Sequence, residues 1–333
     1  MNEEKSLYHP VRIGSTEIKG NIFLAPLAGY TDIPFRSLCI DSGADFTYTE
    51  MVSAEGLYRE GEKTLALLNR APNEGQYAVQ LFMGNSDSLK QALQKLLSYE
   101  PSVIDINCGC PVPKVTKTGA GSAMMKNPSL ITKIVSIITT ETDIPVSVKF
   151  RTGWDSQNEN FLEFAQAALD GGASALTLHA RTRSQGYAPF ADWTKLRVLK
   201  QFCIDHGYDV PIFGSGDLFK AEDAKKMLEQ TSIDGVMFAR GAIGNPFIFA
   251  QAKAILQNSP TIEITVAMKV QAILTHLDRM IAQYGEHSAC TQMRKHTCSY
   301  LKGVQNTAPV KQAVVHATRK EQYLEALSPL VDL

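Results

Sequence analysis

Several common signals are missing from this sequence. The formal net charge of its 333 residues is −1, so no overall basic excess points to nucleic acid, although a local patch stays possible. Its six cysteines are too few and too irregularly spaced for a disulfide framework, which favours a reducing compartment. Residues 1–14 lack the apolar core of a signal peptide, and no apolar run is long enough to span a membrane. These absences predict a cytoplasmic protein.

What the sequence does contain is a regular alternation of short β-rich runs with stretches of helical period. Eight β-rich runs that alternate with helical stretches over roughly 250 residues predict an α/β fold, a (β/α)8 TIM barrel. A doubly wound open sheet is the competing architecture, but the early turn "APLAGYTD" lacks the dinucleotide glycine fingerprint. The helical stretches are 86–100, 128–141, 158–172 and 220–231. The expected strands are 21–26, 44–50, 77–82, 103–107, 145–150, 175–180, 210–214 and 235–240.

The pattern changes after residue 250. Residues 257–265 have the composition of a linker, and 266–284 carry apolar residues at helical spacing. A second helix of roughly 288–302 ends at Gly303, and the remaining residues also have helical character. The sequence therefore predicts a catalytic TIM-barrel domain over residues 1–255 and a small C-terminal all-helical domain over 262–333.

Polar residues end nearly every expected strand. Since catalytic groups of TIM barrels lie at the carboxyl ends of the strands, these residues predict a site at that end. Any one of them could simply satisfy a neighbour, but a whole ring of polar residues is not needed for packing. The residues at these ends are Glu50, Gln80, Asn107, Lys149, Arg151, His179 and Arg181.

The loops after strands seven and eight, "GSGD" and "ARGAIGNP", are rich in glycine. A phosphate site often lies between these two loops of the barrel, and Arg240 adds a fork-shaped cation, so we expect a phosphorylated ligand. A tight turn alone would also need glycine. Lys149 and His179 would lie over the body of the ligand and could stabilise negative charge such as that of a reduced flavin. Gln80 could meet the pyrimidine edge of an isoalloxazine. The alternative for Lys149 is a salt bridge to Asp105 or Glu50.

Seven segments together resemble the tRNA-dihydrouridine synthase family, and most closely its bacterial B-type branch. The resemblance runs from about residue 11 to 325, and the helical tail shares it through "MRKHTCSYLKG". The Asn-x-Gly-Cys-Pro segment at the end of a barrel strand is its most specific part. The seven segments, in the order and spacing of the family, are "APLAGYTDIPFR", "DINCGCPVPKV", "GAGSAMM", "VKFRTGW", "HARTRSQGY", "GSGD" and "ARGAIGNPFIF".

The resemblance implies an FMN-dependent oxidoreductase that reduces the 5,6 double bond of uridines in tRNA, with NADPH as electron donor. Hydride from the flavin would reach C6 of a flipped uridine, and Cys110 would protonate C5. Asn107 would touch the uracil or its flavin platform. The sequence departs from the family where Ser215 replaces a common asparagine and Ala239 a frequent glycine. The implied FMN contacts are Pro26, Leu27, Ala28, Gln80, Lys149, His179, Ser215, Gly216, Asp217, Ala239, Arg240 and Gly241.

Cys108 and Cys110 could bind a metal, form a redox couple, or comprise one catalytic thiol and a bystander. A disulfide between residues two apart is strained, and a metal would need partners from strand ends that the resemblance assigns to FMN. Alternation along the strand places Asp105 and Asn107 on one face and Ile106 on the other, which sends Cys108 away from the flavin. We therefore expect Cys110 to act as the acid and Cys108 to pack.

Residues 288–320 hold six Lys or Arg and no Asp or Glu, which predicts an RNA-facing surface. A solvated helix face is the ordinary alternative for any one of these charges. His287, Cys290, His296 and Cys298 match no zinc pattern, so we expect a packed thiol, an RNA-facing histidine and no metal. The tRNA contacts expected around the mouth and in the tail are Lys114, Lys117, Arg181, Arg183, Arg294 and Lys295.

Two other functions remain open from the sequence. An FMN barrel acting on a free pyrimidine, as in dihydroorotate or dihydropyrimidine dehydrogenases, would use similar chemistry but would not require a basic helical domain. A non-catalytic RNA-binding protein would not require the ring of polar strand ends or Cys110. Neither reading calls for an obligate protein partner.

Overall fold

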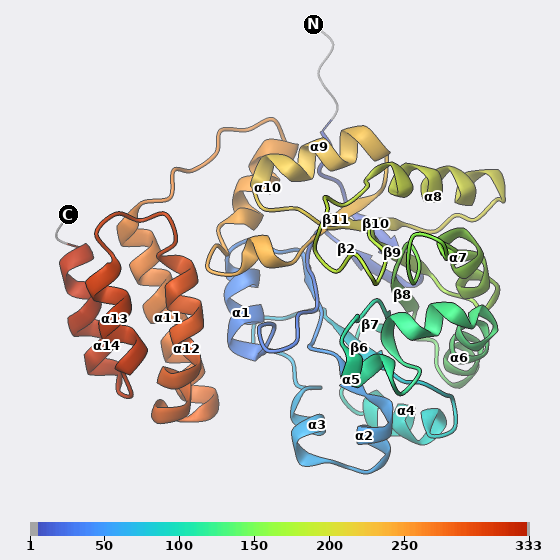
Figure 1. The fold of residues 1–333 in the computed structure, drawn as a ribbon, viewed down its shortest axis with the longest axis horizontal. Coiled ribbons are helices and arrows are strands. Elements are labelled where there is room, and N and C mark those ends of the chain that lie inside the picture. Colours follow the sequence, from blue (N-terminus) through green and yellow to red (C-terminus); the bar gives the residue numbers. More distant parts are fainter. Residues whose placement is uncertain (1–5, 332–333) are drawn as a thin grey trace, which may run out of the picture.

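The computed structural model describes residues 6–331, and its centre is a ring of parallel strands (Figure 1). The strands are β3 (Ile22–Leu24), β4 (Phe46–Thr47), β5 (Val52–Ser53), β6 (Ala78–Phe82), β7 (Val103–Cys108), β8 (Val146–Arg151), β9 (Ala175–His179), β10 (Ile212–Ser215) and β11 (Gly235–Phe238). Their order in the sheet is β4-β3-β11-β10-β9-β8-β7-β6-β5. A parallel bridge from Tyr48 to Ala78 joins the end of β4 to β6 and closes the barrel. The predicted TIM barrel is confirmed.

Helices on the outside of the barrel connect the strands in sequence. The predicted helical stretches correspond to α4 (Leu89–Leu97), α6 (Pro128–Glu141), α7 (Phe161–Asp170) and α9 (Ala221–Thr231). Pro128 occupies the first turn of α6, where its missing N–H costs nothing. The helices of the barrel are α1 (Ile33–Asp41), α2 (Ala54–Tyr58), α3 (Glu62–Ala66), α4 (Leu89–Leu97), α5 (Pro113–Thr116), α6 (Pro128–Glu141), α7 (Phe161–Asp170), α8 (Thr194–Asp205), α9 (Ala221–Thr231) and α10 (Ile248–Leu256).

The pleat of the strands divides the apolar residues between two clusters. In β3, Ile22 and Leu24 pack outward with the helices, whereas Phe23 points into the barrel against Phe213. A hairpin of β1 (Val11–Ile13) and β2 (Thr16–Ile18) adds its own buried side chains to this inner cluster. The hairpin precedes the first barrel strand and covers the amino-terminal ends of the strands, so the carboxyl ends form the open end of the barrel.

Four helices follow the barrel and pack beside α1 (Figure 1). They are α11 (Val266–Tyr284), α12 (Glu286–Tyr300), α13 (Ala308–His316) and α14 (Lys320–Leu327), so the expected 266–284 and 288–302 helices are both present. These helices share a separate apolar cluster, to which α1 contributes Leu38. Arg279 of α11 donates to Ser37 Oγ at 2.9 Å and forms an ion pair with Asp41, which ties the two parts together. Nowhere in residues 6–331 is there a helix long and apolar enough to cross a membrane.

Two histidines lie inside the contact between α1 and the C-terminal helices. The rings of His276 and His296 lie 4.6 Å apart between centroids, and both rings pack on Phe35. Burial lowers the pKa of His276 well below its usual value and that of His296 to about 3, so both rings are neutral. Cys290 is packed as expected, but the prediction of an RNA-facing histidine is wrong for His296, which is 1% exposed.

Candidate active site

A cavity of about 490 Å³ opens at the carboxyl ends of the barrel strands. It is the place where the sequence predicts a site, and Cys110, Asn107 and all but one of the expected cofactor contacts line it. Gly241 is the exception. A side chain at Gly241 would meet the carbonyl oxygen of Leu218 at 2.1 Å, so this glycine allows two loops to pack together and does not face the cavity. The lining residues that the resemblance implied are Pro26, Leu27, Ala28, Gln80, Asn107, Cys110, Lys149, His179, Ser215, Gly216, Asp217, Ala239 and Arg240.

The loop that carries Cys110 is fixed on both sides by hydrogen bonds. Asn107 Oδ1 accepts from the backbone N–H groups of Cys110 at 2.9 Å and Gly109 at 3.2 Å. Arg151 Nε donates to the carbonyl of Gly109 at 2.7 Å, and both the N–H and the hydroxyl of Ser122 donate to the carbonyl of Cys110. Because the backbone is held from both sides, the thiol has a defined position in the cavity.

The two cysteines of this loop have different environments. Cys110 lines the cavity and is partly exposed, and burial raises the pKa of its thiol, which keeps the sulfur protonated at neutral pH. Cys108 is 0% exposed, and its Sγ lies 3.4 Å from the sulfur of Met124. The expectation that Cys108 packs away from the cavity is confirmed.

A chain of hydrogen bonds runs beneath the cavity from Asn107 to β8. Asn107 Nδ2 donates to Gln80 Oε1 at 2.8 Å, and Gln80 Nε2 donates to Asp105 Oδ2 at 2.6 Å. Ser147 Oγ completes the chain with a 2.6 Å bond to the other oxygen of Asp105. Burial raises the pKa of Asp105 to about 6. Gln80 therefore uses one amide N–H and one oxygen lone pair in hydrogen bonds within the protein. Its second N–H and second lone pair remain available to a ligand.

Lys149 and His179 lie on neighbouring strands and face the cavity. Among the described residues, none accepts a hydrogen bond from the Lys149 ammonium, and none forms an ion pair with it within 4 Å. The expected alternative, a salt bridge to Asp105 or Glu50, is therefore not formed, although the charge of Asp105 favours the protonated amine. Burial lowers the pKa of Lys149 to about 8 and that of His179 well below its usual value.

The neutral His179 has a defined tautomer. Its Nε2 lies 3.3 Å from Nη1 of Arg181. A guanidinium can only donate, so this contact requires Nε2 to accept, which leaves the ring proton on Nδ1. His179 therefore has one N–H for another partner.

Arg181 has a different role from the one expected. Its side chain is 1% exposed, and its Nη2 forms a 2.5 Å ion pair with Asp217. Burial would raise the pKa of Asp217, but the bonds from Arg181 and from the N–H of Ala191 lower it. Arg240 also contacts this carboxylate, at 3.4 Å. The expectation that Arg181 contacts tRNA is not supported by the structure, because its charge is buried and paired.

Gly216 leaves space that a side chain would fill. Its φ is +117°, and an added Cβ would lie 2.9 Å from His179 Cδ2 and 3.0 Å from the Cβ of Ala191. Backbone at this position can approach a ligand closely, as a phosphate site between β10 and β11 requires. An unpaired ammonium, a neutral imidazole and this glycine fit a flat, phosphorylated ligand with an electron-rich edge.

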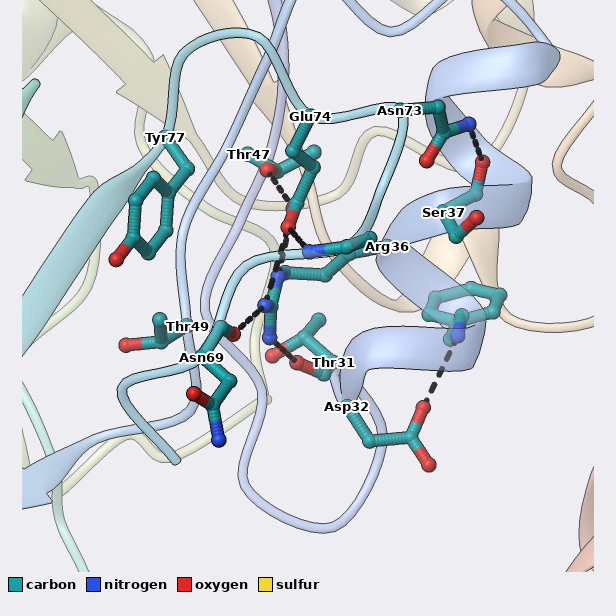
Figure 2. A network of polar contacts seen from close by, with 12 residues as sticks. Thr31, Asp32, Arg36, Ser37, Thr47, Thr49, Asn69, Asn73, Glu74 and Tyr77 are labelled. Atoms are coloured by element: carbon teal, nitrogen blue, oxygen red, sulfur yellow. Dashed lines mark hydrogen bonds and ion pairs between the residues drawn. The ribbon is translucent and has the colours of Figure 1, made fainter. Parts of the chain in front are cut away.

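The loop after β3, which supplies Pro26, Leu27 and Ala28, is supported by a buried ion pair (Figure 2). Arg36 of α1 donates to both carboxylate oxygens of Glu74, at 2.7 and 3.2 Å. Its third nitrogen donates to the carbonyl of Thr31 at 3.0 Å, and the hydroxyl of Thr31 accepts from the N–H of Leu27. The pair thus holds both α1 and the cavity loop, and no sequence motif predicts it.

The other expected RNA contacts lie at the rim of the cavity and on α12. Lys114 and Lys117 are exposed near α5, and the guanidinium of Arg183 lies 4.6 Å from the ring of Trp154. Lys295 is exposed and donates to the carbonyl of Gly29, which joins α12 to the cavity loop. Arg294 is half-buried and donates to the carbonyl of Ala317 at 2.9 Å, so it has less freedom to meet RNA.

Several residues of the cavity were not assigned a role from the sequence. Tyr30, Met51, Tyr187 and Phe219 come from loops whose apolar letters resemble ordinary packing residues. The sequence predicts Arg151 as the end of a strand, but its contact with Gly109 depends on the fold of a loop far away in the chain. No sequence period indicates such contacts.

Comparisons with known proteins agree with this geometry. A sequence model of the family described as dihydrouridine synthase matches residues 23–332. A probable tRNA-dihydrouridine synthase of Treponema pallidum is 45% identical over 95% of this chain and 94% of its own length. The tRNA-dihydrouridine synthase B of Pasteurella multocida is 36% identical over 97% of this chain and 96% of its own.

Solved structures share the fold at low identity. A 2-naphthoyl-CoA reductase complex superposes with a TM-score of 0.57 at 11% identity, over 77% of this chain and 52% of that chain. The histamine dehydrogenase of Rhizobium sp. 4-9 gives a TM-score of 0.52 at 12% identity, over 82% of this chain and 51% of that one. This chain thus spans about half the length of both proteins, and the likeness shows the barrel fold alone.

Proposed function

Because this chain belongs to the dihydrouridine synthase family, we propose that it reduces the 5,6 double bond of uridine in tRNA, with bound FMN and with NADPH as the electron donor. The observation that carries the proposal is the placement of Cys110. Its protonated thiol lies on a fixed loop that faces the same cavity as Lys149 and His179. An acid and two groups suited to an electron-rich ring are what this reaction needs.

The residues of the cavity fit a flavin. Lys149 and the N–H of His179 would hold the electron-rich edge of the isoalloxazine, and the remaining donor of Gln80 would meet its pyrimidine ring. Ser215, the backbone of Gly216 and Arg240 would hold the phosphate. When bound and reduced, FMN supplies the hydride that is added to C6 of uracil.

Cys110 would complete the reduction at C5. Hydride addition at C6 leaves negative charge on C5 and O4 of the uracil, and transfer of the Sγ proton to C5 neutralises it and yields 5,6-dihydrouridine. The thiolate that remains regains a proton from solvent. Since burial raises the pKa of Cys110, the proton is present at neutral pH before each turnover. Asn107 would position the acid by holding the N–H groups of Gly109 and Cys110.

The basic residues of the C-terminal helices support a tRNA substrate. We propose that residues 1–255 form the FMN-binding catalytic domain and that 262–333 form a tRNA-binding domain. Lys295 of α12 would bind the phosphate backbone together with Lys114 and Lys117 near α5. This division of work requires neither a membrane nor an obligate protein partner, and it suits a cytoplasmic enzyme.

The experiment that tests the function uses the purified full chain and unmodified tRNA transcripts. We expect the protein to carry flavin absorbance, with FMN identified by mass, and to form dihydrouridine in tRNA when NADPH is supplied. Free uridine should not be reduced, and raising the salt concentration should weaken tRNA binding steeply. Reduction of a free pyrimidine but not of tRNA would replace this proposal by the small-molecule reading. NADH supplied in parallel measures which nicotinamide cofactor is preferred.

A further inference from the structure

Aromatic side chains project into solvent at the rim of the cavity. Phe190 is 88% exposed, Tyr187 is 56% exposed, and Phe219 is 48% exposed. All three lie in loops that follow the carboxyl ends of β9 and β10, at the open end of the barrel. Exposed apolar surface with polar residues around it is typical of a site that binds another molecule.

The backbone around Phe190 is fixed although 88% of the residue is exposed. The carbonyl of Pro189 accepts from the buried Arg181 Nε at 2.8 Å, and the N–H of Ala191 donates to Asp217 Oδ2 at 2.7 Å. Both neighbours of Phe190 are therefore bound to the same buried Arg181–Asp217 pair. The loop presents the ring from a rigid base, and little conformational entropy would be lost when a partner covers it.

Positive charge lies beside two of these rings, those of Tyr187 and Phe219. The guanidinium carbon of Arg240 lies 4.2 Å from the ring centroid of Tyr187 and 5.0 Å from that of Phe219. Asp217 is the carboxylate that contacts this arginine, and it is already paired with Arg181. Exposed rings next to an ordered cation have the composition of a surface that binds single-stranded nucleic acid, because bases stack on rings and phosphates meet cations.

The position of these rings at the mouth of the cavity indicates which part of an RNA would contact them. A uridine that enters the cavity must leave its stack, and the bases on either side then lose a stacking partner. We propose that Phe190, together with Phe219, forms a platform on which an unpaired base next to the target uridine stacks. This inference rests on the proposed function and adds to it a surface that recognises RNA bases without reading their sequence.

Substitutions at Phe190 test the platform. Phe190→Ala should weaken binding of an unmodified, fluorescently labelled tRNA transcript at least about fivefold, while reduction of the bound flavin by NADPH keeps its rate. Phe190→Trp should bind as the unaltered protein does, whereas Phe190→Leu should resemble Phe190→Ala, because stacking requires a flat ring. Ile204→Ala is the matched control, since Ile204 is 59% exposed at the end of α8 and should bind tRNA normally.

Tryptophan fluorescence gives a second readout that does not depend on catalysis. The emission added by Phe190→Trp should be quenched when tRNA binds, because the indole stacks on a base, and the emission added by Ile204→Trp should not. Unchanged affinity in Phe190→Ala, equal affinity in Phe190→Leu, or an unquenched Phe190→Trp would overturn the platform. Those results leave dihydrouridine formation by the unaltered protein intact, whereas failure of that protein to act on tRNA would reject the function itself.

Discussion

Glu74 offers a sharp test of how the cavity loop is held. Its carboxylate accepts from Arg36 Nε at 2.7 Å, from Arg36 Nη2 at 3.2 Å, from the hydroxyl of Thr47 at 2.5 Å, and from the N–H of Ala71. The side chain of Arg36 is 2% exposed and that of Glu74 is 0% exposed. In Glu74→Gln, an amide NH₂ replaces one accepting oxygen, and the guanidinium of Arg36 stays buried without a counter-charge.

The expected cost follows from that burial. Removing one partner of a buried ion pair destabilises a protein by about 3–5 kcal/mol, because the charge that remains cannot be hydrated. The matched control is Glu55→Gln, since the Glu55–Arg59 pair is highly exposed, with 53% and 74% of the two side chains accessible. Loss of an exposed pair of this kind should leave the stability nearly unchanged.

Urea unfolding followed by far-UV circular dichroism measures the difference. Glu74→Gln should lower the midpoint clearly, and the flavin should be released at a lower urea concentration than in the unaltered protein, because Arg36 also binds the carbonyl of Thr31 in the cavity loop. Equal unfolding midpoints of Glu74→Gln and Glu55→Gln would contradict a stabilising role of the buried pair.

Three further predictions concern the cavity and the contact between barrel and tail. Gly216→Ala should weaken FMN binding about tenfold or more, because its methyl group would collide with His179. Gly207→Ala is the control, since Gly207 also has a positive φ but lies in open space, and it should bind FMN normally. Quenching of FMN fluorescence measures the affinity of both variants. Lys149→Met should weaken FMN binding far more at pH 7 than at pH 10. The pKa of Lys149 is about 8, so in the unaltered protein the ammonium is already deprotonated at pH 10. Equal losses of affinity at the two pH values would contradict this prediction. The free energy of unfolding should fall as the pH drops from about 6.5 towards 3, because His296 binds a proton in the unfolded chain but not in the folded protein, where its pKa is about 3. The loss by pH 5 is up to about 2 kcal/mol. In His296→Phe, the unfolding free energy measured by urea titration should change less with pH over this range.

Features that depend on local sequence could be predicted well. The alternation of β-rich runs and helical periods fixed the barrel, because each strand and helix is specified by its own residues. Once the strands were placed, their polar last residues had to meet at one end, which located Gln80, Asn107, Lys149 and His179 in one cavity. The pleat of β7 placed Cys108 on the packed side, whereas Cys110 lies in the loop beyond the strand and its role was implied by the family resemblance.

Features that depend on contacts between distant segments could not be predicted. A sequence shows that Arg181 is charged, but the burial of its side chain against Asp217 arises only when the loops after β9 and β10 come together. The burial of His296 could not be predicted for the same reason, because its neighbours Tyr30 and Phe35 belong to the barrel and not to its own helix. The Arg36–Glu74 pair joins positions separated by 38 residues, and no period or motif marks it.

The most direct measurement compares Cys110→Ala with Cys108→Ala in single-turnover experiments. The flavin is first reduced by NADPH in the absence of oxygen, and its reoxidation by an unmodified tRNA transcript is then followed by absorbance. Cys110→Ala should be reduced normally but reoxidised by tRNA at least about a hundredfold more slowly, as expected for loss of a general acid. Cys108→Ala, which loses only a packed sulfur, should be reoxidised at close to the rate of the unaltered protein. Reoxidation of Cys110→Ala at that same rate would contradict the role of Cys110 as the proton donor.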